Sequence, residues 1–140
     1  MTERNQVHHI ARKYLSPFGR LVRFENSLVA GTPDLYYLLR GVSGWLEEKM
    51  VEPSGILPKH LTLEQIMWGE AEVRNGGRWH LLARCGPAWW LMDARGCRSW
   101  YQGAPATPLI AITGRFPVKE ILDIIAPLRP KDERYDHDAG

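Results

Sequence analysis

Two acids and a lysine at the ends of a candidate hairpin are the residues best suited to chemistry in this chain. Residues 31–49 read GTPDLYYLLRGVSGWLEEK, so Asp34 opens one apolar run and Glu47 and Lys49 lie two apart at the end of the next. Neighbouring buried carboxylates are costly unless something compensates their charge. Mg²⁺ would do so, since it is usually held by one or two carboxylates with water and substrate phosphate. The alternative is a solvated hairpin edge with an ion pair between Asp34 and Lys49.

Strand alternation predicts that the three residues share a face. With a four-residue turn at residues 40–43, Asp34 would face Lys49 across the hairpin and lie diagonal to Glu47. A slip of one residue would move Asp34 to the opposite face. A lysine beside a metal held by carboxylates can orient water and stabilise charge on phosphorus, so the pattern favours phosphodiester hydrolysis.

Periodicity and turn residues place this hairpin inside an α/β chain. Thr62 and Gln65 form a capping-box pattern at the start of the second expected helix. The chain is expected to form one domain over residues 1–130, with a central sheet and a helix on each side, followed by a polar, disordered tail over 131–140. The expected helices are 2–15, 62–75 and 118–128, and the expected strands are 20–26, 34–39, 44–51, 78–84, 88–93 and a short one at 109–112 in an otherwise irregular stretch, 97–116.

The distribution of charge says more than its total, which is +2. A cationic N-terminal end suits a polyanion such as nucleic acid, and a solvated basic helix face is the alternative. Cys85 and Cys97 belong to no CxxC pair, which argues against a zinc site. No apolar run has the length of a membrane span and the N-terminus does not read as a signal peptide, so a cytoplasmic protein is expected. The basic residues of the first 23 positions are Arg4, Arg12, Lys13, Arg20 and Arg23, against one acid, Glu3.

At the hairpin residues the chain resembles a known family. Pro33-Asp34 followed by Glu47-x-Lys49 resembles the signature of the PD-(D/E)XK nuclease superfamily. RFENSLVAGTPDLYYLLRGVSGWLEEK, LTLEQIMW and NGGRWHLLAR closely resemble small phage-type nucleases of its VRR-NUC and Holliday-junction-resolvase-like branch, over roughly residues 3–92. The resemblance implies a restriction-endonuclease-like αβββαβ core, a mixed sheet flanked by helices.

The resemblance also implies roles for the site residues. Asp34 and Glu47 would be metal ligands with the backbone carbonyl of Glu48, and Lys49 would be the catalytic lysine. Mg²⁺ would be the cofactor, with Mn²⁺ able to substitute.

Three further positions belong to the site by the same resemblance. An additional acid would come from Glu25 or from Glu3, and Glu25 is favoured because it lies within the resembling stretch. Gln65 would support the active site, unless it serves only the capping box. Glu48 departs from the family, in which this position is usually apolar. Either Glu48 meets a cation on the far face of the sheet, or that face is unusually open.

The expected function is a Mg²⁺-dependent, structure-selective endonuclease acting on branched DNA, as a Holliday-junction resolvase does, in the host cytoplasm if it is phage-encoded. The five basic residues above would hold phosphates, and a homodimer interface could use Trp89, Trp90 and the last helix. His8 and His9 would have a surface or DNA-facing role. The alternatives are a nicking or restriction-like VRR-NUC endonuclease with sequence preference, and a catalytically silent DNA-binding module, which only Glu48 favours.

Overall fold

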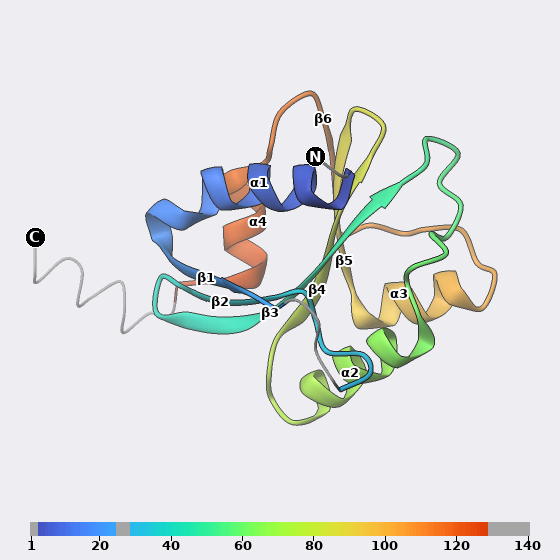
Figure 1. Cartoon of the computed structure of the whole chain (residues 1–140), viewed down its shortest axis with the longest axis horizontal. Coiled ribbons are helices and arrows are strands. Elements are labelled where there is room, and N and C mark those ends of the chain that lie inside the picture. The colour runs from blue at the N-terminus through green and yellow to red at the C-terminus, as the bar shows by residue number, and fades with distance from the viewer. Residues whose placement is uncertain (1–2, 25–28, 129–140) are drawn as a thin grey trace, which may run out of the picture.

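A six-stranded mixed sheet between two pairs of helices forms the chain (Figure 1), and the computed structural model describes residues 3–24 and 29–128. The sheet order is β1-β2-β3-β4-β5-β6, in which β3 and β4 are parallel and every other described pair is antiparallel. The elements are α1 (Glu3–Leu15), a 3₁₀ turn (Ser16–Phe18), β1 (Gly19–Arg23), β2 (Leu35–Leu39), β3 (Val42–Val51), α2 (Leu63–Arg74), β4 (Trp79–Cys85), β5 (Ala88–Asp93), α3 (Ala94–Tyr101), β6 (Ile110–Thr113) and α4 (Val118–Ile125).

The expected fold class is confirmed, because the chain begins with the αβββαβ order and has a mixed sheet flanked by helices. Parallel strands need a crossover, and α2 supplies it between β3 and β4. The expectation of one domain over residues 1–130 stays a prediction, and the tail 131–140 lies outside the described residues.

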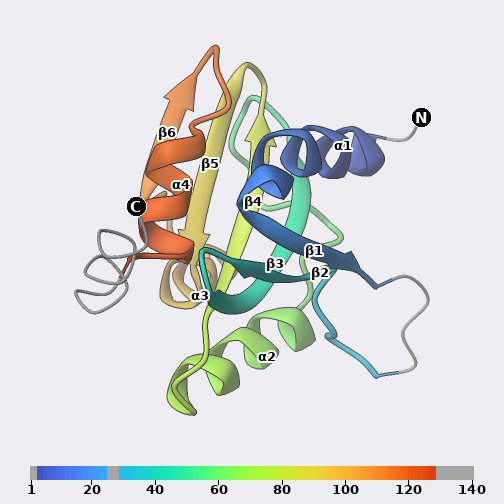
Figure 2. The same cartoon turned by 90° about the vertical axis from the view of Figure 1, so that its left-hand side faces the viewer.

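The helices divide between the two faces of the sheet. Apolar residues of α1 and α4, such as Leu15 and Ile121, pack with Leu35 and Leu46 into one core cluster. Figure 2 looks onto that face, with α1 and α4 in front of the sheet. The second cluster lies on the opposite face beneath α2 and α3, where Ile66 of α2 is fully buried. Each face of β3 is therefore covered by different helices.

The β2–β3 hairpin has a tighter turn than expected. Leu39 pairs with Val42, so the turn contains only Arg40 and Gly41, both with positive φ, 53° and 75°. This backbone is typical of a two-residue turn whose twist matches that of the strands. The expected four-residue turn was wrong: the turn has two residues, and the strand pairing is shifted by two residues from the expected register. Because side chains alternate with period two, a shift of two leaves every residue on its expected face.

One helix was missed in the stretch expected to be irregular. Asp93 caps α3 by accepting a hydrogen bond from the backbone N–H of Gly96 at 2.7 Å. An aspartate three residues before that N–H is an ordinary helix start, which sequence reasoning passed over because Gly96 read as a strand terminator. β6 and α4 fall close to their expected positions.

Candidate active site

Asp34, Glu47 and Lys49 come together on one face of the β2–β3 hairpin, as expected. Leu35 pairs with Leu46, so continuing the register by one residue places Asp34 opposite Glu47 rather than opposite Lys49. Directly opposite residues on antiparallel strands have Cβ atoms about 4.5–5.5 Å apart. All three side chains are buried, with exposed fractions of 5%, 0% and 6%. The solvated hairpin edge is thereby excluded.

Asp34 is held by the backbone of the strand that carries the other two. Its Oδ2 accepts a hydrogen bond from the N–H of Glu48 at 2.9 Å. A charge-assisted bond of this kind is stronger than a neutral one, and here it fixes the carboxylate against β3. The backbone of Glu48 thus orients one expected metal ligand.

Glu47 is held from the opposite direction by α2. Its Oε1 accepts a hydrogen bond from Nε2 of Gln65 at 3.0 Å. The same Gln65 completes the capping box of α2, since its Oε1 accepts from the N–H of Thr62 at 2.9 Å. The capping-box interpretation of Gln65 is confirmed, and the same amide group also supplies a donor to Glu47. That Gln65 supports an active site stays a prediction.

Lys49 supplies the positive charge beside these acids. Its Nζ lies 3.9 Å from Oε1 of Glu47, at the long end of an ion pair. A buried ammonium this close to a carboxylate offsets part of the cost of burying both. The distance also leaves the ammonium room to contact a further group at the same face.

Glu48 points to the opposite face of β3, where it meets α1. Its Oε1 lies 2.9 Å from Nδ1 of His8, and the Glu48 side chain is 1% exposed. Glu48 therefore has a partner on the far face, the His8 ring, and that face is closed by α1. A surface position for His8 is wrong, since His8 is only 8% exposed, and the DNA-facing alternative stays a prediction. The signal in the sequence was the unusual acid itself, which needed a partner from the helix on that face.

The donor types at this face fit a hard divalent cation. Asp34 and Glu47 offer carboxylate oxygens from neighbouring segments of the hairpin, and β3 also offers the backbone carbonyl of Glu48. Among the described residues, no group of three His, Cys, Asp or Glu side chains gathers closely enough to hold a metal without other ligands. Mg²⁺ in proteins commonly keeps waters and substrate phosphates in its shell, so one or two carboxylates are enough to hold it.

The additional acid remains a prediction. Glu25 lies outside the described residues, and so does the side chain of Glu3, although α1 begins at Glu3. The side chain of Arg4 also lies outside the described residues. Of the other expected phosphate contacts, Arg12, Lys13 and Arg20 are exposed, and Arg23 is half-buried at the end of β1.

Aromatic rings adjoin the acids on the α2 side of the sheet. The ring of Trp45, two residues before Glu47, lies 5.4 Å from that of Tyr36, 5.7 Å from Phe24 and 5.9 Å from Trp68. Phe24 is 40% exposed, so this apolar group reaches the surface near the acids.

The residues expected to form a dimer interface are mostly used within the monomer. Trp89 is 4% exposed and packs in the α1–α4 cluster, and Trp90 packs on the opposite face, as strand alternation requires. The apolar residues of α4 are buried in the same cluster as Trp89. The homodimer stays a prediction, and these residues are not free to form its interface because they pack within the monomer.

Neither cysteine is set up as a nucleophile or metal ligand. Both are free thiols, and both are buried. Burial, with smaller contributions from the nearby Asp93 and Glu47, raises the pKa of Cys97 to about 12. This thiol stays protonated at neutral pH.

None of the helices in the described part of the chain combines the length and apolar character of a membrane span.

Comparison with known proteins gives a distant likeness, to solved structures. No family model matches the chain, and no curated protein matches it. Among solved structures it is similar to Hjc, a Holliday junction resolvase from the archaeal hyperthermophile Archaeoglobus fulgidus, with a TM-score of 0.49 and 13% sequence identity over 67% of this chain and 75% of that one.

Proposed function

We propose that this protein is a Mg²⁺-dependent DNA endonuclease that selects branched DNA, acting as a Holliday-junction resolvase. The observation that carries the proposal is the gathering of Asp34, Glu47 and Lys49, all nearly inaccessible to solvent, on one face of two adjacent strands. Such a cluster is costly for stability alone, and it matches the residue types that the sequence resemblance implies.

In this proposal Asp34, Glu47 and the Glu48 carbonyl hold the metal. When bound, Mg²⁺ supplies Lewis-acid polarisation of the phosphate and a more acidic bound water. The chain's own residues do the rest. The Glu48 N–H and the Gln65 amide fix the two carboxylates, and the Lys49 ammonium is placed to orient water or to stabilise charge on a phosphate oxygen.

The test is cleavage of a labelled four-way junction in Mg²⁺, with a linear duplex of the same sequence as the comparison. Asp34→Asn, Glu47→Gln and Lys49→Ala should each abolish cleavage and leave junction binding largely intact. Asp123→Asn is the matched control, because Asp123 is exposed on α4 and its ion pair is with Arg40, away from the three acids and lysine of the hairpin. Full cleavage by any of the three site variants would refute the assignment, and equal cutting of the linear duplex would refute the preference for branched DNA.

Two alternatives make different predictions for cleavage. A restriction-like or nicking enzyme would show base preference in cleavage of random-sequence DNA, whereas a resolvase should follow the branch point. A silent binding module rested on Glu48 alone. Since Glu48 pairs with His8 on the other face, it no longer speaks against activity.

A further inference from the structure

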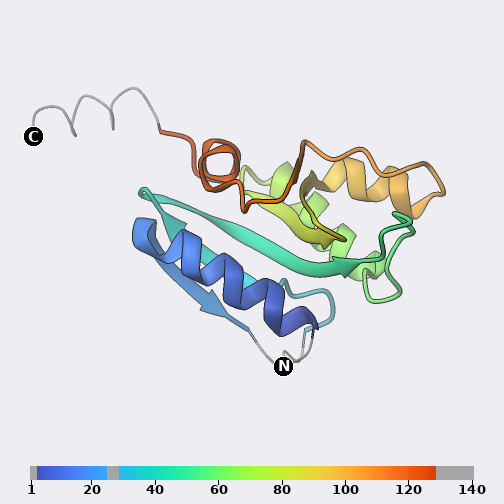
Figure 3. The same cartoon turned by 90° about the horizontal axis from the view of Figure 1, so that it is seen from above.

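A recess lined by basic side chains lies between α1 and the end of β1, on the face of the sheet opposite the acids. We call it the α1 recess. It has a volume of about 410 Å³, within the range of small-ligand pockets, about 300–1,000 Å³. Figure 3 shows α1 running alongside β1 and the β2–β3 hairpin. Its lining residues are Asn5, His8, His9, Arg12 and Arg23.

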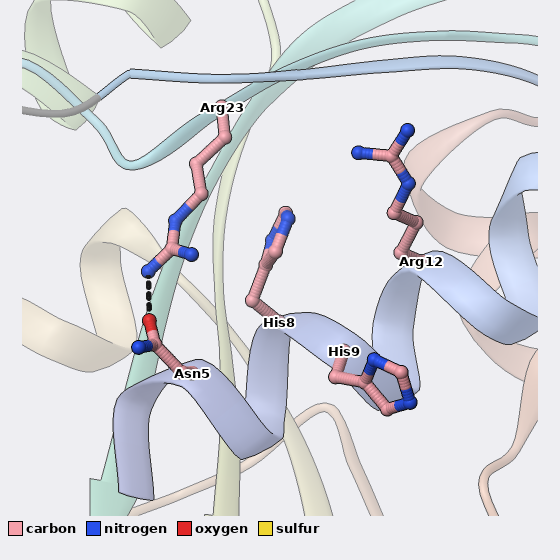
Figure 4. A pocket seen from close by; sticks show the side chains of 5 residues that line it. All are labelled: Asn5, His8, His9, Arg12 and Arg23. Atoms are coloured by element: carbon pink, nitrogen blue, oxygen red, sulfur yellow. Dashed lines mark hydrogen bonds between the residues drawn. The ribbon is translucent and has the colours of Figure 1, made fainter. Parts of the chain in front are cut away.

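The four lining residues from α1 fall at positions 5, 8, 9 and 12, which is the spacing of a single helix face. Sequence reasoning missed this stripe because it treated His8 and His9 as a diverging pair. In Figure 4 the His8 ring stands between the side chains of Arg23 and Arg12. None of the lining residues within the described part of the chain is acidic and two are arginines, so these side chains favour an anion.

The cationic groups differ in how firmly they are held. Arg23 donates from Nη2 to Oδ1 of Asn5 at 2.5 Å, which orders its guanidinium at one wall. Arg12 is exposed and makes no hydrogen bond or ion pair with another described residue. His8 uses Nδ1 for Glu48, which leaves Nε2 as the ring nitrogen that can meet a ligand. Two guanidiniums beside an imidazole match the oxygens of a phosphate group.

The recess is close to the acids along the sheet, although it opens on the other face. Arg23 ends β1, and the next N–H, that of Phe24, donates to the carbonyl of Asp34 at 2.8 Å. The floor of the recess is linked to the same residue, since His8 bonds Glu48 and the Glu48 N–H bonds Asp34. A nucleic acid that crosses this end of the sheet can reach both places.

We infer that the α1 recess binds a phosphate group of the nucleic acid other than the one that is cleaved, with Arg12 and Arg23 as its charged donors and His8 at its floor. The nature of the ligand rests on the proposed function. Binding there holds a second point of the substrate against the helix that supports β3 from behind, and so fixes how the substrate approaches the acids.

The first test uses inorganic phosphate as the probe, with the His8 ring nitrogens followed by ¹⁵N NMR. Phosphate should shift the His8 signals saturably where chloride at the same ionic strength does not. Arg12→Gln should weaken that response at least fivefold. Lys119→Gln, an exposed charge on α4 outside the recess, should leave it unchanged. No response of His8 to phosphate would overturn the site.

The second test measures junction binding in EDTA by fluorescence anisotropy across a salt series, in an Asp34→Asn background. If Arg12 neutralises one phosphate, Arg12→Gln should reduce the slope of log K against log salt by about 0.9 and weaken binding, and Lys119→Gln should do neither. An unchanged slope overturns binding of a nucleic-acid phosphate, even if free phosphate shifts His8. If the wild-type chain cuts junctions while this slope is unchanged, the recess fails and the proposed function stands. If the slope changes but no junction is cut, the proposed function fails and the recess stands.

Discussion

Replacing Gln65 with glutamate separates the two hydrogen bonds that this side chain makes. Glutamate at this position keeps an acceptor for the Thr62 N–H, so the capping box survives. It removes the donor to Glu47 and sets a second carboxylate against one that is fully buried. The variant therefore tests the contact with Glu47 and spares the cap.

The expected loss of stability follows from the contact that is removed. A hydrogen bond to a charged group contributes roughly 1.5–3 kcal/mol. Two carboxylates about 4 Å apart add repulsion of about 4 kcal/mol at an effective dielectric constant near 20, and uptake of one proton relieves much of it. We therefore expect Gln65→Glu to lower the free energy of unfolding by about 2–4 kcal/mol. The matched control Thr62→Ala removes the cap and keeps the amide near Glu47, and should cost about 1 kcal/mol.

Urea unfolding followed by tryptophan fluorescence in EDTA measures both variants without metal. With a slope of about 2 kcal/mol per molar urea, Gln65→Glu should shift the midpoint by about 1–2 M and Thr62→Ala by about 0.5 M. For cleavage, Gln65→Leu removes both bonds and should lose 10–100-fold in activity, because Glu47 loses the group that orients it, whereas Thr62→Ala should stay near wild type. If Gln65→Glu is as stable as wild type, or if Gln65→Leu and Thr62→Ala are equally active, Gln65 is only a cap.

Three further changes test the surroundings of the site. His8→Leu leaves the Glu48 carboxylate buried without its partner and should cost about 3–5 kcal/mol, while His8→Leu with Glu48→Met should recover most of it; equal unfolding midpoints for wild type and His8→Leu would contradict the pairing. Burial lowers the pKa of His80 to about 4, below its unfolded value near 6.5, so the unfolded chain takes up the proton first. The free energy of unfolding should therefore fall by up to about 3 kcal/mol as the pH drops from about 7 to 4. The difference in stability between wild type and His80→Asn across that range measures this, and parallel curves would refute it. Gly69→Ala would drive a Cβ into the Trp79 indole and should destabilise by about 1–3 kcal/mol despite alanine's better helix propensity, with thermal unfolding as the measurement and a raised Tm as the contrary result.

The same packing explains how Gln65 reaches Glu47. Gln65 and Gly69 are four residues apart and lie on one face of α2. Gly69 has no side chain, so α2 approaches Trp79 of β4 closely. Trp79 pairs with Trp45, and two positions further along β3 stands Glu47. A glycine that looks like a weak point in the helix therefore sets the distance between α2 and the acids.

The sequence by itself determined the face shared by Asp34, Glu47 and Lys49. Side-chain alternation along a strand is a local property, so the shared face was correct even though the turn was two residues too long. The capping box of Thr62 and Gln65 was readable for the same reason, since both ends of it lie within one helical turn.

Only the tertiary structure decided which partners these residues meet. His8 and Glu48 are 40 residues apart in sequence. They pair because α1 packs on the face of β3 that carries Leu46 and Glu48. The α1 recess needs the last residue of β1 beside one face of α1, and no local pattern specifies that packing. Periodicity says which way a side chain points. What it meets there depends on how whole elements pack, which is set by contacts distant in sequence.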